Sequence, residues 1–90
     1  MTGQEIADVR KRLSLSQVQL AQLIGVHPLT VSKWERDILR PTPHQEAMLG
    51  SFGTASAANA DLGDEIARLL LTAGVAFALY KVLEAAFRKP

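Results

Sequence analysis

The feature that most constrains how this chain folds is the short interval between two helix signals at residues 25 and 28. Ser16 is a residue type that begins helices, and the apolar segment "QVQLAQLI" follows it. Gly25 is expected to end this helix, because glycine adopts the left-handed backbone without steric cost. Only Val26 and His27 separate it from Pro28, which suits the first turn of the next helix. The sequence therefore predicts two short helices joined by a turn of about three residues, which is helix-turn-helix geometry.

Further capping signals lie on both sides of this unit. Thr2 with Glu5, and Thr42 with Gln45, have the spacing of a capping box, in which two residues satisfy free amides at a helix start. The first predicts an N-terminal helix, and the second predicts a helix that ends near Leu49. No alternation of apolar and polar residues is long enough to indicate a strand. The fold class is therefore predicted to be all-α.

The chain of 90 residues is expected to form one compact domain, or a small domain with an appendage. Residues 1–50 hold most of the polar and turn-forming residues. Residues 51–63 are rich in glycine, alanine and serine, which predicts a linker or a loosely helical connection. Residues 64–90 form a C-terminal apolar segment. The chain is thus divided at residues 50 and 63.

Composition argues against several classes of site. The chain has no cysteine and only two histidines, 17 positions apart, so neither a metal site nor a cofactor is expected. The acids are scattered and no glycine-rich phosphate loop is present, so no enzyme activity is expected. The net charge is only +1, and any basic surface must be local. The N-terminal segment carries charge where a secretion signal would be apolar, which predicts a soluble cytoplasmic protein.

Residues 13–42, "LSLSQVQLAQLIGVHPLTVSKWERDILRPT", combine a turn glycine, helix caps and core positions at mutually consistent spacings. They resemble the helix-turn-helix of lambda-repressor-like (Xre-type) transcription regulators, and the resemblance covers residues 3–50. It implies a DNA-binding bundle of four to five helices, whose third helix lies in the major groove of double-stranded DNA. One departure is Asp37, which stands where the family commonly has glycine. Aspartate tolerates the left-handed backbone less well than glycine, so the exit from the third helix is expected to differ slightly.

The resemblance also implies roles for individual residues. Gln17 occupies the position of a glutamine that contacts a phosphate at the start of the second helix. Arg10 and Glu35 occupy the positions of a structural ion pair between the first and third helices. The loop after the third helix runs beside the sugar-phosphate backbone in this family, and Arg36 and Arg40 lie near it.

A helix in the major groove presents positions i, i+1, i+4 and i+5 on one face, which from Pro28 selects Leu29, Ser32 and Lys33. Lys33 is expected to donate to guanine, Ser32 to bond with either base type, and Leu29 to contact a thymine methyl group. His27 is expected to cap the turn. The predicted DNA-contacting residues are Gln17, His27, Pro28, Leu29, Thr30, Ser32, Lys33, Arg36, Arg40 and Thr42.

The C-terminal segment, "DEIARLLLTAGVAFALYKVLEAAFRKP", is predicted to be a helix over 64–88 with Asp64 as its N-cap. No charged residue occurs from Leu69 to Tyr80, so apolar side chains cover nearly the whole circumference and must be buried on all sides. Gly74 costs about 1 kcal/mol relative to alanine, which leaves a kink or a division into two helices open. The residues predicted for a dimer contact are Ile66, Leu69, Leu70, Ala73, Gly74, Phe77, Tyr80, Leu83 and Phe87.

Three roles for this segment stay open. A dimerisation helix is favoured, because two-fold dimers contact two half-sites about 34 Å apart. A membrane segment is not favoured, since the 12 uncharged residues fall short of the ~20 that span a bilayer. The third role is a docking surface for a partner protein.

The sequence thus predicts a homodimeric transcriptional repressor that binds a palindromic operator, with residues 28–36 in the major groove. The first alternative is an antitoxin-like protein that binds a toxin through residues 64–88 and autoregulates its operon. The second is a scaffold that kept the fold and lost DNA binding.

Overall fold

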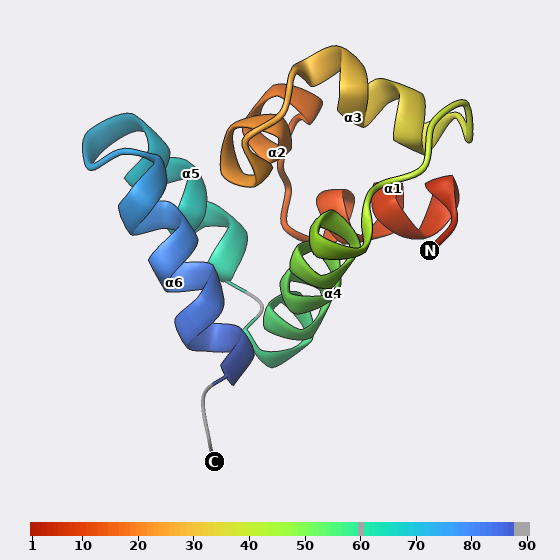
Figure 1. The fold of residues 1–90 in the computed structure, drawn as a ribbon. Helices are drawn as coiled ribbons and strands as arrows, with labels where there is room; N and C mark the ends of the chain where they lie inside the picture. Colours follow the sequence, from red (N-terminus) through yellow and green to blue (C-terminus); the bar gives the residue numbers. More distant parts are fainter. Residues whose placement is uncertain (60, 88–90) are drawn as a thin grey trace.

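The computed structural model describes residues 1–59 and 61–87, and within these ranges it contains helices and no strand (Figure 1). The prediction of an all-α fold is confirmed. The expected end of the C-terminal helix at residue 88 lies outside the described residues. The helices are α1 (Gly3–Arg12), α2 (Gln17–Ile24), α3 (Pro28–Glu35), α4 (Pro43–Ala58), α5 (Leu62–Thr72) and α6 (Val75–Phe87).

The helix starts follow the capping signals of the sequence. Thr2, Ser16 and Thr42 each form a capping box with the residue three positions later. Gly25 follows α2 with a φ of 83°, in the left-handed region, and Pro28 is the first residue of α3. The predicted turn of three residues between the second and third helices is confirmed.

α4 is longer than predicted. The helix expected to end near Leu49 continues to Ala58, so residues 51–58 are helical, which agrees with the expectation of a helical connection and not with that of a linker. Leu49, Phe52 and Ala55 recur at intervals of three and are wholly buried, with α4 packed against α1 and α6. Burying a leucine or phenylalanine side chain stabilises the fold by about 1.5–3 kcal/mol. This gain outweighs the cost of about 1 kcal/mol for Gly53, the one glycine among residues 51–58.

α5 and α6 form an antiparallel pair on one side of the molecule (Figure 1). The predicted single helix is interrupted at Gly74, whose φ of 97° lies in the left-handed region. The Gly74 N–H donates to the carbonyl of Leu69 at 2.7 Å, which ends α5. α5 begins at Leu62, so the prediction that Asp64 is the N-cap is wrong. No helix among the described residues is long and apolar enough to cross a membrane.

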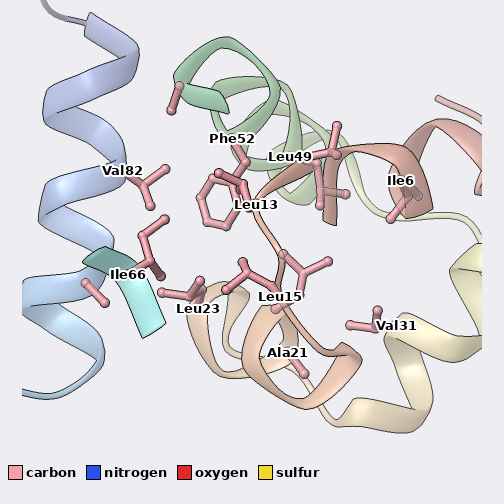
Figure 2. Packing of buried hydrophobic residues seen from close by; sticks show 14 of the residues in the cluster. Ile6, Leu13, Leu15, Ala21, Leu23, Val31, Leu49, Phe52, Ile66 and Val82 are labelled. Carbon is pink, nitrogen blue, oxygen red and sulfur yellow. The ribbon is translucent and has the colours of Figure 1, made fainter. Parts of the chain in front are cut away.

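The helical pair shares one apolar core with the first four helices. Figure 2 shows Ile66 of α5 and Val82 of α6 pointing toward Phe52 of α4 and Leu13, and each of these side chains is at most 1 % exposed. Ile66 was predicted to contact a second copy, but its burial inside the chain makes it inaccessible to a partner. The first four helices thus cover one side of the apolar pair α5 and α6.

The N-terminal end of α5 approaches the end of α1 very closely. Gly63 is buried, and a Cβ atom built at this position would overlap the carbonyl oxygen of Leu13. Gly50, in the middle of α4, has no atom within 4 Å of such a Cβ. The packing therefore requires a glycine at position 63, whereas position 50 has room for a side chain.

We expect Gly63→Ala to lower the free energy of unfolding by about 2 kcal/mol or more, because α5 must move away from Leu13. Gly50→Ala is the matched control and should raise stability by about 0.5–1 kcal/mol, since it adds helix propensity without a clash. Urea unfolding followed by circular dichroism measures both. Equal effects of the two substitutions would contradict the close packing of α5 on Leu13.

Candidate nucleic-acid interface

α3 has one buried face and one free face. Val31 and Trp34 are at most 1 % exposed and belong to the core. Leu29, Ser32 and Lys33 lie on the opposite side of the helix, with Leu29 51 % exposed and the other two half-buried. The structure thus brings the predicted recognition residues onto one accessible face.

The N-terminal end of α3 is fixed by two residues. The ring Nδ1 of His27 accepts a hydrogen bond from the Leu29 N–H at 3.0 Å, so His27 caps the helix as expected. Pro28 has no N–H, so the first helical position leaves no donor without a partner. Thr30 is half-buried and lies on the side of Trp34, apart from the recognition residues.

The basic residues that follow α3 are exposed. Arg36 comes four residues after Ser32 and continues the same face, with its Nε donating to the Ser32 carbonyl at 3.3 Å. Arg40 and Thr42 are exposed in the connection to α4, where the Thr42 hydroxyl oxygen accepts from the Gln45 N–H at 3.2 Å. These positions extend the interface beyond the end of α3.

One carboxylate joins three helices beside this interface. Arg10 donates through Nε to Glu35 Oε2 at 2.6 Å and through Nη2 to Oε1 at 2.9 Å. The same guanidinium donates through Nη1 to the carbonyl of Leu15 at 3.0 Å. Gln17 Nε2 also donates to Glu35 Oε1, at 3.2 Å, a contact that the sequence did not indicate. The expected ion pair is therefore present, and it holds the first residue of α2.

Both members of this pair keep their charges. Burial raises the pKa of Glu35, but hydrogen bonds from Arg10 and Gln17 outweigh burial and hold this pKa below its ordinary value. The hydrogen bond to Glu35 raises the pKa of Arg10. The two side chains are only 15 % and 10 % exposed, so the pair is a nearly buried unit without net charge.

The sequence comparisons address the same part of the chain. A family model described as "Helix-turn-helix" matches residues 6–45, which extend from α1 to the first turn of α4. The matched segment is a lambda-repressor-like helix-turn-helix domain. The match covers 40 of the 90 residues and indicates a DNA-binding helix-turn-helix regulator. No curated protein and no solved structure matched the chain.

Within the helix-turn-helix domain, Asp37 has a role that the sequence did not reveal. Its φ of 58° lies in the left-handed region that glycine commonly occupies, and its Oδ1 accepts from the Gly3 N–H at 2.9 Å. A Cβ on Gly3 would lie 2.5 Å from the Glu35 carbonyl oxygen, so α1 starts in direct contact with the end of α3. Asp37 therefore ends one helix and caps another.

The acids at the end of α3 are thus engaged inside the domain. Arg10 neutralises Glu35, and the positive end of α1 lies beside Asp37. Lys33, Arg36 and Arg40 then set the local charge, although the whole chain carries only +1. No group of three or more His, Cys, Asp or Glu side chains that could hold a metal ion occurs among residues 1–59 and 61–87.

A substitution series separates the two roles of Asp37. We expect Asp37→Ala to lower the unfolding free energy by about 1–3 kcal/mol, through a left-handed alanine and a lost cap. Asp37→Asn should be nearly neutral, because asparagine keeps both the acceptor and the left-handed preference. Asp37→Gly should fall between them, since it removes only the cap. Thermal or urea unfolding tests this order, and an alanine variant as stable as the asparagine variant would contradict it.

Proposed function

We propose that the chain is a cytoplasmic transcriptional repressor that binds a palindromic operator as a homodimer, with α3 in the major groove. The observation that carries this proposal is the accessible face of α3, formed by Leu29, Ser32 and Lys33 opposite the buried Val31 and Trp34. It occurs in a helix-turn-helix domain, whose family binds DNA.

The three side chains on this face suit contacts with base edges. Lys33 donates to O6 and N7 of guanine, and Ser32 bonds with either base type. Leu29, which is 51 % exposed, packs on the methyl group of thymine. Because only one of the three is charged, apolar contact and DNA shape contribute much of the specificity.

Contacts with the sugar-phosphate backbone fix the orientation of α3 in the groove. Gln17 and His27 lie at the starts of α2 and α3, where free backbone N–H groups also favour a phosphate. Arg36 and Arg40 supply positive charge after α3. The remaining proposed contacts come from Pro28 and Thr42, whereas the predicted contact from Thr30 is not retained because Thr30 lies on the side of Trp34.

Only some of the residues predicted for the dimer contact are exposed on α6. Leu69 and Leu70 pack partly against the core, and Ala73 and Gly74 lie at the turn between α5 and α6. The remaining members form an exposed stripe on α6, which we call the α6 stripe. It consists of Phe77, Tyr80, Leu83 and Phe87, which are 62 %, 64 %, 36 % and 72 % exposed.

A second copy of the chain is the occupant that best suits the α6 stripe. A two-fold contact pairs a surface with itself, and the exposed acid on this face, Glu84, is paired with Lys81 at 3.4 Å, which reduces its repulsion of a second copy. Aromatic side chains bury about 150–250 Å² each, so covering three on both copies removes on the order of 800 Å² from water. Leu83 and adjoining residues bring this area toward the ~1,000 Å² that a specific interface needs.

The proposed dimer also suits the proposed target and mode of action. Two copies related by a two-fold axis contact two inverted half-sites about 34 Å apart, which is the symmetry of a palindromic operator. With α3 on DNA and α6 in the dimer, occupancy of a promoter blocks transcription without further surfaces. Selection of bound sequences from a random duplex library tests this, and an inverted repeat is the expected result.

Lys33→Ala should weaken binding to the selected operator by about 1–3 kcal/mol and relax the preference at one base pair. Gln17→Ala should weaken binding to every sequence, because a phosphate contact carries no base information. Arg68→Ala, which removes an exposed cation of α5, is the control and should bind like the wild type. Fluorescence anisotropy measures all three. Unchanged binding by a Lys33→Ala, Gln17→Ala double variant would contradict this docking.

Tyr80→Glu should convert the dimer into a monomer, because it places a buried charge on each side of the contact. Tyr80 is 64 % exposed within one chain, so the helical fold should be retained. Thr54→Glu, at an exposed position of α4, is the control and should remain dimeric. Sedimentation velocity distinguishes the species. A wild-type chain that stays monomeric at micromolar concentration would contradict the homodimer.

A further inference from the structure

The hydrogen bond between Gln17 and Glu35 connects a proposed phosphate contact with an ion pair inside the protein. Gln17 is the first residue of α2 and is half-buried. Its Nε2 donates to Glu35 Oε1 at 3.2 Å, while its second N–H and its amide oxygen bond to none of the described residues. One donor of this side chain is therefore engaged, and another is available.

The acceptor decides how the carboxamide of Gln17 is oriented. An ionised carboxylate only accepts hydrogen bonds, so Nε2 must be directed toward Glu35 and the amide oxygen away from it. Because the carboxamide is planar, this single bond also sets the direction of the second N–H. A glutamine without such a partner samples many rotamers and both amide orientations.

Glu35 performs this role without repelling DNA, because Arg10 neutralises it. The guanidinium donates to both carboxylate oxygens, at 2.6 and 2.9 Å, and Glu35 Oε1 accepts from Arg10 and Gln17 together. An unpaired carboxylate beside Gln17 would repel an approaching phosphate. The ion pair thus provides an acceptor without net charge at the start of α2.

We propose that Glu35, held by Arg10, is a positioning residue that orients the Gln17 carboxamide so that its second N–H donates to a DNA phosphate. This inference rests on the proposed function and adds a role in DNA binding to a pair otherwise needed for the fold. Ordering a flexible side chain in advance is worth about three- to tenfold in affinity for each protomer.

A double-mutant cycle tests the coupling between the pair and Gln17. The pair is replaced by Arg10→Met with Glu35→Leu, which leaves the net charge unchanged and leaves no buried charge without a partner. Wild type, this variant, Gln17→Ala and the triple variant are titrated with a duplex of about 20 base pairs of arbitrary sequence at low salt, because phosphate contacts do not depend on sequence. Circular dichroism verifies that each variant is folded.

Replacing the pair should weaken binding about three- to tenfold for each protomer when Gln17 is present, and have no effect in the Gln17→Ala background. A replacement that leaves affinity unchanged, or lowers it equally in both backgrounds, overturns the inference. If the wild type binds the duplex and the cycle shows no coupling, only this inference fails. A wild type that binds no duplex removes the proposed function as well.

Side-chain relaxation in the wild type gives a second test that needs no variant. Gln22 is exposed on the same helix and forms no side-chain hydrogen bond with the described residues, so it is an internal reference. The Nε2 order parameter of Gln17 should approach that of rigid backbone, about 0.8, whereas that of Gln22 should lie below about 0.6. Equal disorder of the two side chains overturns the inference even if the paired replacement fails to fold.

Discussion

The carboxylate of Glu35 is the interaction on which the arrangement of the first three helices depends. It accepts two hydrogen bonds from Arg10 on α1 and one from Gln17 on α2, while belonging to α3 itself. Removing one partner of a buried pair costs about 3–5 kcal/mol, against a total stability of about 5–15 kcal/mol for a small domain. The angle between α2 and α3 is therefore fixed by polar contacts as well as by the core.

The surface proposed to contact DNA is determined by which side of α3 is buried in the core. Trp34 and Val31 occupy one side of α3, so Leu29, Ser32 and Lys33 must lie on the other. The acids next to them are held within the domain, by Arg10 in one case and by the start of α1 in the other. A chain of nearly zero net charge thus presents a locally basic surface. The two acids at the end of α3 are paired inside the domain, whereas Lys33, Arg36 and Arg40 are not paired with an acid among the described residues.

Local signals in the sequence predicted the starts of α1 to α4 and the turn, because each depends on residues within about four positions. The extent of α4 was not predictable in this way. Its second half, which is rich in alanine and serine, is helical only because Phe52 and Ala55 pack against helices far along the chain. The hydrogen bond from Gly3 to Asp37 spans 34 positions and has no local signature. Predicting the α6 stripe required knowing which side of the apolar segment its own chain covers, and Ile66 was misassigned for that reason.

The helical course of residues 51–58 sets a limit on the DNA targets of the proposed dimer. A flexible linker would let each recognition helix move independently of the dimer contact and would tolerate half-sites with spacers of several lengths. In this fold α4 continues through those residues and packs against α6, which carries the α6 stripe. In the proposed dimer, the packing of α4 on α6 then fixes the distance between the two recognition helices. Inserting a single base pair between half-sites turns one of them by about a tenth of a helical turn, and the packing of α4 on α6 opposes the movement by which the proposed dimer would follow it.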